Sequence, residues 1–93
     1  MLTLDATVKI PPWASFASVD EGVVLLNTRS NFYFSLDEVG SRFWELLHAG
    51  KRLQQCYRTL LKEFEVEPAR LEADLLELLE NLQEQGLVEI DAA

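Results

Sequence analysis

The stretch that decides the fold runs from residue 22 to residue 36 and reads GVVLLNTRSNFYFSL. An apolar run, Val23–Asn27, and an aromatic run, Phe32–Ser35, flank the polar segment 28–31, which is the pattern of two strands joined by a tight turn. Asn31 tolerates the left-handed backbone that such a turn uses. These residues predict an antiparallel hairpin.

Upstream residues extend this hairpin into a meander. Segment 14–19 is extended in pattern and leads into Asp20, Glu21 and Gly22, where a glycine suits a short hairpin loop. Before it, apolar and polar residues alternate over 4–10 until Pro11 and Pro12, as in a half-buried strand or an extended arm. We therefore expect three antiparallel strands preceded by an N-terminal strand or arm within residues 1–13.

The period becomes helical after residue 36. Ser35 and Glu38 have capping-box spacing, so a first helix is expected to start near Leu36 and to end at Gly50. A third helix is expected from Pro68 to Gly86. The apolar positions of the three helices are Val39, Phe43, Leu46 and Leu47; then Leu53, Cys56, Tyr57, Leu60, Leu61 and Phe64; then Leu71, Leu75, Leu78 and Leu82.

One leucine of the third helix falls outside its core stripe. At 100° per residue, Leu76 lies about 130° from the mean direction of that stripe. Glu72, Leu79 and Gln83 share its flank. A single exposed leucine needs no explanation, but beside an aromatic strand Leu76 would form the floor of a groove.

Strands followed by three helices predict an α+β fold, winged helix-turn-helix-like, in a single domain over residues 1–93. The 93 residues are 48% hydrophobic, enough for a core, and carry 8 basic against 16 acidic residues, a net charge of -8. Such a charge repels a phosphate backbone. The third helix has Arg70 as its only cation, so nucleic-acid binding is disfavoured despite the fold class.

No residue pattern indicates catalysis. His48 has no second histidine or metal-spaced cysteine beside it and suits the C-terminal end of a helix dipole. Cys56 shares an apolar stripe, which favours a buried structural thiol. The carboxylates fit a solvated helix face, and the four glycines form no phosphate-binding loop. We expect no enzyme, no metal and no cofactor.

The compartment follows from two further patterns. The N-terminus lacks a secretory signal, and no apolar run approaches the length of a membrane span. A single cysteine fits a reducing cytoplasm.

Of the two tryptophans, Trp44 is expected in the core, and Trp13 is expected to cover one end of the sheet.

The third strand is unusual because Phe32, Tyr33 and Phe34 make both of its faces aromatic. In a three-stranded meander this strand is also an edge with unpaired backbone groups. Either the arm at 4–10 or the C-terminal tail with Leu87, Val88 and Ile90 covers it, or it accepts a peptide as an added strand.

Several segments in this order resemble the PqqD-like family of precursor-recognition domains. They are 24–27 (VLLN), 31–40 (NFYFSLDEVG), 43–47 (FWELL), 73–76 (ADLL), Leu82 and 86–87 (GL). Many relatives have Asn-Glu-Thr-Gly where 37–40 stand and a glycine where Asn31 stands. The resemblance covers roughly residues 14–90, and the arm before it has no family counterpart.

The resemblance implies a non-catalytic domain that binds the leader segment of a ribosomal precursor peptide. The leader would pair with Asn31, Phe32, Tyr33, Phe34 and Ser35, and Asp74, Leu75, Leu76 and Leu79 would line a groove beside it. Acidic groups at the rim favour a leader with Lys or Arg.

The implied partners are that precursor leader peptide and a modifying enzyme, either a leader peptidase and cyclase of the lasso-peptide type or a radical enzyme. A free-standing presenter of the lasso-peptide type, monomeric or weakly dimeric, is the preferred interpretation. Two alternatives remain open: an acidic winged-helix regulatory or protein-interaction module, and a structural subunit whose edge strand serves only homodimerisation.

Overall fold

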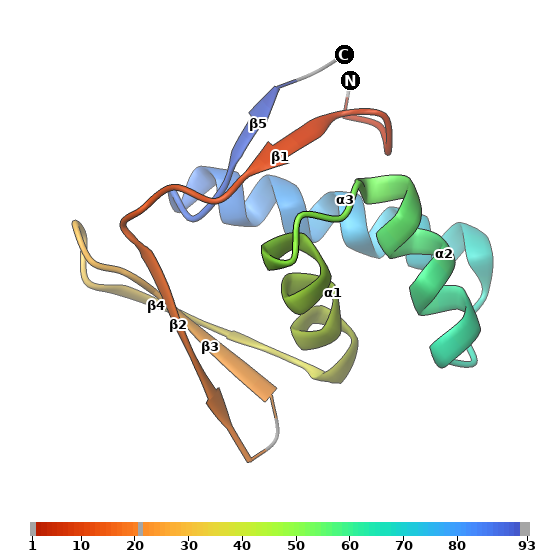
Figure 1. The fold of residues 1–93 in the computed structure, drawn as a ribbon, viewed down its shortest axis with the longest axis horizontal. Helices are drawn as coiled ribbons and strands as arrows, with labels where there is room; N and C mark the ends of the chain where they lie inside the picture. Colours follow the sequence, from red (N-terminus) through yellow and green to blue (C-terminus); the bar gives the residue numbers. More distant parts are fainter. Residues whose placement is uncertain (1, 21, 92–93) are drawn as a thin grey trace.

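A three-stranded sheet and three helices form the two layers of the computed structural model, which describes residues 2–20 and 22–91 (Figure 1). The helices lie on one side of the sheet, and a short second sheet joins the two ends of the chain. The elements in chain order are β1 (Thr7–Lys9), β2 (Ala14–Val19), β3 (Gly22–Asn27), β4 (Phe32–Leu36), α1 (Glu38–His48), α2 (Leu53–Glu63), α3 (Pro68–Glu84) and β5 (Glu89–Asp91).

The main sheet has the order β2-β3-β4 and is antiparallel throughout. Leu25 at its centre is opposite Phe16 on β2 and Phe34 on β4. The predicted meander is therefore confirmed, with the last strand one residue longer than expected because Leu36 pairs with Val23. The three strands followed by three helices confirm the predicted α+β fold of winged-helix type.

The N-terminal arm does not cover β4. Its strand β1 pairs with β5, and Val8 is opposite Ile90 in this separate two-stranded sheet. Leu4 and Ala6 are buried beside it, and so are Leu87 and Val88 of the tail. The arm and the tail thus pair with each other, and the interpretation in which one of them occupies the aromatic edge strand is wrong.

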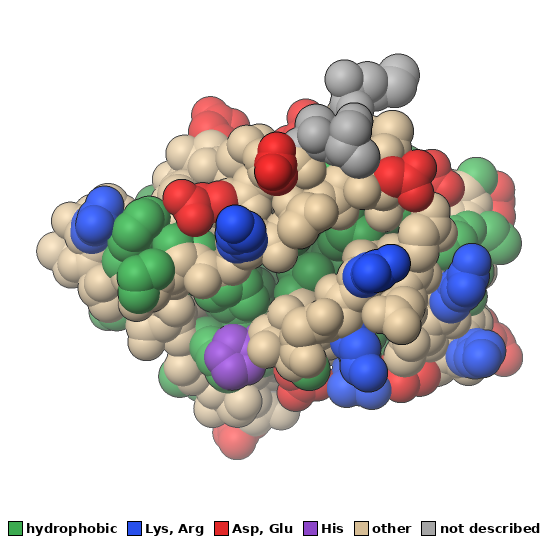
Figure 2. Space-filling view, turned by 45° about the horizontal axis from the view of Figure 1, so that its top comes forward, with side chains coloured by type: hydrophobic (Ala, Val, Ile, Leu, Met, Phe, Trp, Pro, Cys, Tyr) green, Lys and Arg blue, Asp and Glu red, His purple; other side chains and the backbone are tan. Residues whose placement is uncertain are grey.

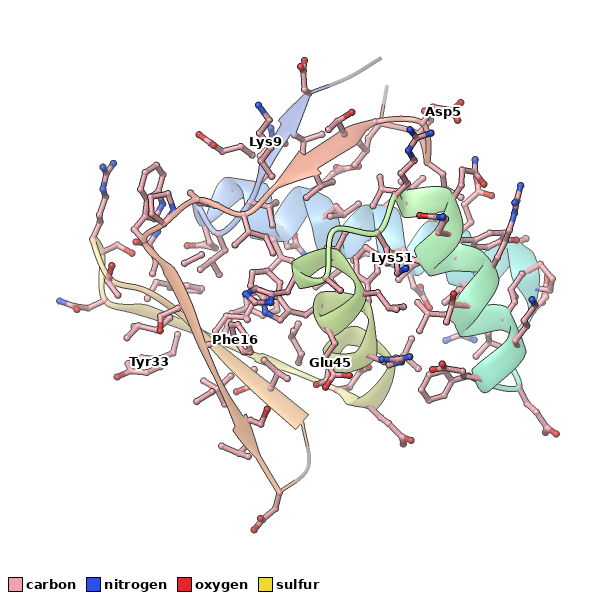
Figure 3. The ribbon with its side chains drawn as sticks, viewed as in Figure 1. Asp5, Lys9, Phe16, Tyr33, Glu45 and Lys51 are labelled. Carbon is pink, nitrogen blue, oxygen red and sulfur yellow. The ribbon has the colours of Figure 1, made fainter. Side chains whose placement is uncertain are left out.

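The core lies between the sheet and the helices. Leu25 is fully buried, and Phe43 and Trp44 of α1 are each 1% exposed, as expected for Trp44. Phe16 packs edge-on against Trp44 with ring centroids 6.0 Å apart, whereas Tyr33 points away from the helices (Figure 3). Because successive strand residues alternate in direction, the inner face of the sheet is fixed by Phe16, Leu25 and Phe34.

Helix α1 begins later than the capping-box pattern predicted. Its N-cap is Asp37, whose Oδ1 accepts a hydrogen bond of 2.7 Å from the Gly40 backbone N–H. Ser35 lies in the sheet opposite Val24, and the pairing continues to Leu36, so the helix begins too late in the chain for Ser35 to be its N-cap. Aspartate is as good an N-cap as serine, and the strand pairing decides between them.

One buried hydroxyl attaches the end of β4 to α1. Ser41 Oγ accepts a hydrogen bond of 2.8 Å from the Val23 N–H and donates one of 3.3 Å to the Leu36 carbonyl. A Cβ on Gly22 would lie 2.6 Å from that carbonyl oxygen and 2.7 Å from Ser41 Oγ, so only glycine fits there. Gly22, which was expected in the loop, is the first residue of β3. Glu21 of that loop lies outside the described residues.

A second attachment holds the opposite end of the sheet against the end of α3. The Trp13 indole N–H donates to the Gly86 carbonyl at 2.8 Å, and Asn27 Nδ2 donates to the Gln85 carbonyl at 2.8 Å. The Arg29 guanidinium lies 3.7 Å from the centroid of the Trp13 ring. Gly86 ends the helix as predicted, with the left-handed φ of 71°. These contacts fix how the sheet sits relative to α3.

Candidate functional site

The outer edge of β4 is free in the described part of the chain. Its only strand partner there is β3, so alternate N–H and C=O groups along Phe32–Leu36 face outward. Phe32 is 37% exposed and Tyr33 66% exposed. Asn31, which precedes the strand, adopts the predicted left-handed backbone with φ of 62°. This edge therefore combines unpaired backbone groups with exposed aromatic rings.

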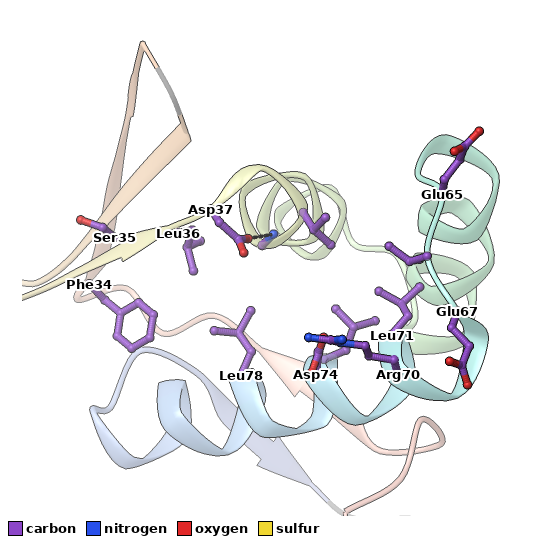
Figure 4. Close-up of a pocket in the computed structure, with 14 residues that line it drawn as sticks. Phe34, Ser35, Leu36, Asp37, Glu65, Glu67, Arg70, Leu71, Asp74 and Leu78 are labelled. Atoms are coloured by element: carbon purple, nitrogen blue, oxygen red, sulfur yellow. Dashed lines mark hydrogen bonds and ion pairs between the residues drawn. The ribbon is translucent and has the colours of Figure 1, made fainter.

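A groove of about 680 Å³ lies beside this edge (Figure 4). Four segments form its walls: the end of β4, the start of α1, the turn between α2 and α3, and α3 as far as Leu78. Its lining residues are Phe34, Ser35, Leu36, Asp37, Val39, Gly40, Glu65, Val66, Glu67, Arg70, Leu71, Asp74, Leu75 and Leu78.

The floor of the groove is apolar and its rim is charged. Phe34, Val39 and Leu78 are half-buried, while the deeper leucines are buried in the core. The rim carries four carboxylates, on Asp37, Glu65, Glu67 and Asp74, and one guanidinium, on Arg70. A groove of this kind suits an extended chain with apolar side chains, and it disfavours an anionic one.

The structure brings several of the predicted site residues together. Phe34, Ser35, Asp74 and Leu75 all line the groove. The other three residues of the predicted pairing segment, Asn31, Phe32 and Tyr33, lie along the same edge but outside the groove lining.

Two residues of α3 that were predicted to line the groove lie on other sides of the helix. Leu79 is fully buried in the core, and Leu76 is half-buried against the core without lining the groove. Leu78, expected in the core, lines the groove instead. The core stripe is in fact Leu71, Leu75, Leu79 and Leu82. The periodicity argument therefore puts the leucine pair at 78–79 on the wrong faces.

Sequence patterns also missed the far wall of the groove. Val66 is 36% exposed in the turn between α2 and α3, flanked by Glu65 and Glu67. An apolar residue between two acids in a turn was the available signal for a surface contact. Arg70 and Leu71 line the same end, and no spacing rule links them to a strand more than thirty positions earlier in the sequence.

The two groups considered for catalysis lie away from the groove. His48 of α1 is exposed and is the purple side chain in Figure 2. Its ring centroid lies 4.8 Å from that of Phe16. Cys56 is fully buried, as predicted, and burial raises the pKa of its thiol to about 11.

Within residues 2–20 and 22–91, no three His, Cys, Asp or Glu side chains form a group that could hold a metal. No helix in those ranges is long and apolar enough to cross a membrane.

Fold and site together define a winged-helix-like domain with a free sheet edge beside an apolar groove. The family model of coenzyme PQQ synthesis protein D (PqqD) matches residues 22–88, and the chain belongs to this family.

Two solved structures are similar to this chain over most of its length. "TbiB1 in Complex with the TbiA(beta) Leader Peptide" has 38% sequence identity and a TM-score of 0.81, covering 87% of this chain and 94% of that one. "Lasso peptide synthetase B1 complexed with the leader peptide" has 30% identity and a TM-score of 0.79, covering 88% and 96%. A comparison with curated proteins gives no significant match.

Proposed function

We propose that the protein binds the leader segment of a ribosomally made precursor peptide, which adds as a strand to the free edge of β4 and rests in the groove against α3. The observation that carries this proposal is the unpaired edge of β4 lying directly beside an apolar groove. Both similar solved structures are complexes with leader peptides, which supports the same kind of ligand here.

The chemistry of the site suits an unstructured peptide. Such a chain loses conformational entropy on binding, and main-chain pairing along β4 offsets part of that loss without demanding a particular sequence. Selectivity then comes from apolar side chains that contact Phe34 and Leu78 on the groove floor. Affinities from micromolar to nanomolar, about 8 to 12 kcal/mol, are ordinary for such a site.

In this proposal the domain performs no chemistry itself. It acts in the cytoplasm, as a monomer or weak homodimer, and brings the leader to a modifying enzyme by raising the effective concentration of the precursor. The similar proteins favour a lasso-peptide pathway, in which the enzyme is a leader peptidase with its cyclase, over a radical-enzyme pathway. The exposed face of α3 is acidic, which supports a peptide ligand over a nucleic acid.

An NMR titration tests the proposal. The probes are a synthetic leader from the precursor gene nearest to the gene of this protein and the TbiA(beta) leader, with a scrambled version of each as control. We expect the amide signals of residues 31–36 and of Leu78 to shift with the leaders and not with the scrambled peptides. A response confined to another surface, or no response to either leader, contradicts the proposal.

A further inference from the structure

The groove has two chemically different ends. Its apolar end lies against the sheet, where Phe34 faces Leu78 across the groove (Figure 4). Its charged end lies at the turn between α2 and α3, where Glu65 and Glu67 flank Val66. A peptide lying along the groove therefore contacts aromatic and aliphatic side chains at the sheet end and the carboxylates of Glu65 and Glu67 at the other end.

The carboxylates of the groove differ in what already holds them. Asp37 accepts the N-cap hydrogen bond from the Gly40 N–H at 2.7 Å. Asp74 pairs with Arg70, the one guanidinium of the groove, at 3.8 Å. Among the described residues no ion pair includes Glu65 or Glu67, and both side chains are exposed. The two glutamates at the far end are therefore the carboxylates left to meet a charge on the ligand.

The distance between the two ends sets a spacing in the peptide. Leu78 follows Glu67, the N-cap of α3, by eleven positions, which is about 16 Å at 1.5 Å per residue. An extended chain advances about 3.3 Å per residue, so about five residues cover that distance. A side chain over Leu78 and one over Glu67 are then about five positions apart in the ligand.

We infer that the groove recognises peptides with two features: an aliphatic or aromatic residue that packs between Phe34 and Leu78, and a Lys or Arg about five positions away that pairs with Glu65 or Glu67. This inference rests on the proposed function and adds the ligand's charge and spacing to it. The apolar contact supplies most of the affinity, because exposed ion pairs are weak. The glutamates select among peptides that share the apolar residue and repel those with an acid at the same place.

An unbiased peptide selection tests this spacing and charge preference, and it does not require the natural ligand. The full-length protein is used to select from a displayed library of random peptides about 15 residues long, more than the groove length requires. We expect the enriched peptides to carry Lys or Arg about four to six positions from an apolar residue. Their amide shifts on the labelled protein should map to β4 and α3.

Charge-reversed proteins make the selection specific to the two glutamates. The double variant Glu65→Lys with Glu67→Lys should enrich peptides with Asp or Glu at that spacing and should bind the original peptides about threefold to tenfold more weakly. The matched control is Glu72→Lys with Glu77→Lys, which makes the same charge change on exposed residues of α3 outside the groove lining. Its selected peptides should match those of the unmodified protein. Glu65→Gln with Glu67→Gln removes the charge with the least effect on folding and should abolish the preference without reversing it.

The outcomes separate this inference from the proposed function. Peptides that bind at β4 but show no basic preference, or an unchanged preference in the charge-reversed protein, overturn the inference and leave leader binding standing. A reversal that also occurs in the control variant overturns it as well, since the preference then reflects net charge. If no enriched peptide perturbs β4 or the groove, the proposed function itself is wrong.

Discussion

At the scale of single residues, Cys56 shows how burial sets chemistry. The thiol has no exposed surface, and Sγ donates a hydrogen bond of 3.9 Å to the Lys51 carbonyl. Burial disfavours the thiolate and raises the pKa to about 11 from an ordinary value near 9. The residue is therefore a small apolar contact of α2 and not a nucleophile.

This pKa shift predicts a loss of stability at high pH. Between about pH 9 and 11 the unfolded chain has lost the thiol proton while the folded protein keeps it, so the unfolded state binds fewer protons and stability falls as pH rises. We expect the stability advantage of the native protein over Cys56→Ala to shrink by about 1 to 2 kcal/mol between about pH 8.5 and pH 10.5. Urea unfolding of both proteins under reducing conditions measures it.

The comparison with Cys56→Ala cancels the titration of lysine and tyrosine, which both proteins share. The cavity left by the substitution lowers stability equally at every pH. A stability advantage that stays constant over this pH range would mean that burial does not raise the pKa of the Cys56 thiol.

At the scale of elements, the exposed character of β4 could be predicted from the sequence, whereas the core-facing side of α3 could not. The edge strand could be predicted because Phe32, Tyr33 and Phe34 make both of its faces aromatic. A strand that is buried on one face only would alternate apolar and polar residues. Helix α3 was ambiguous because adjacent leucines at 75–76 and 78–79 let its stripe be drawn in two phases. The phase is decided by packing against α2 and the sheet, which lies outside the helix's own sequence.

The start of α1 was mispredicted for a related reason. Ser35 has capping-box spacing to Glu38, and serine and aspartate are about equally good N-caps, so local rules do not favour Asp37. The pairing of β4 with β3 continues to Leu36 opposite Val23, so the helix begins only after that residue and Asp37 is its cap. Local patterns thus located the elements, and long-range contacts set their ends and faces.

The corrected phase of α3 predicts which leucine matters for binding. Leu78 and Leu76 are both half-buried against the core, but only Leu78 lines the groove. We expect Leu78→Ala to weaken leader binding by about 1 kcal/mol or slightly more, roughly fivefold to tenfold, because part of a leucine contact is lost. Isothermal titration with the leader probes measures this change.

Leu76→Ala is the matched control, since it removes the same atoms from the same helix at similar exposure. It should lower the unfolding free energy about as much as Leu78→Ala does and leave leader affinity within about twofold, less than 0.5 kcal/mol. Equal losses of affinity in the two variants would place the ligand on a different face of α3.

At the scale of the whole molecule, the groove has one wall on the sheet and the other on the helices. Its width therefore depends on how these two layers are held together. Ser41 attaches the Leu36 end of β4 to α1, and Asn27 and Trp13 attach the other end of the sheet to the residues that follow α3. Asn27 is opposite Phe32, so the second attachment acts on the strand next to the binding edge.

Asn27 gives a way to loosen this attachment without touching the groove. Its Oδ1 accepts hydrogen bonds from the Arg29 and Ser30 N–H groups at 2.9 and 3.2 Å, and its Nδ2 donates to the Gln85 carbonyl. Asn27→Asp keeps both acceptor contacts of the turn but replaces the donor with an oxygen that faces a carbonyl oxygen. We expect a loss of about 1 to 3 kcal/mol in unfolding free energy, because the side chain is buried and the carbonyl loses its partner.

The same variant should weaken leader binding severalfold although no lining residue changes, because the two walls of the groove are no longer held at one separation. Thr28→Ala is the control: it removes an exposed hydrogen bond of 3.1 Å to the Trp13 carbonyl from the same turn and should change stability by less than about 0.5 kcal/mol.

Urea unfolding and leader titration of both variants measure the two effects. If Asn27→Asp loses stability but binds the leader with unchanged affinity, the groove is shaped by α1 and Ser41 alone, and the attachment at the end of α3 serves folding only.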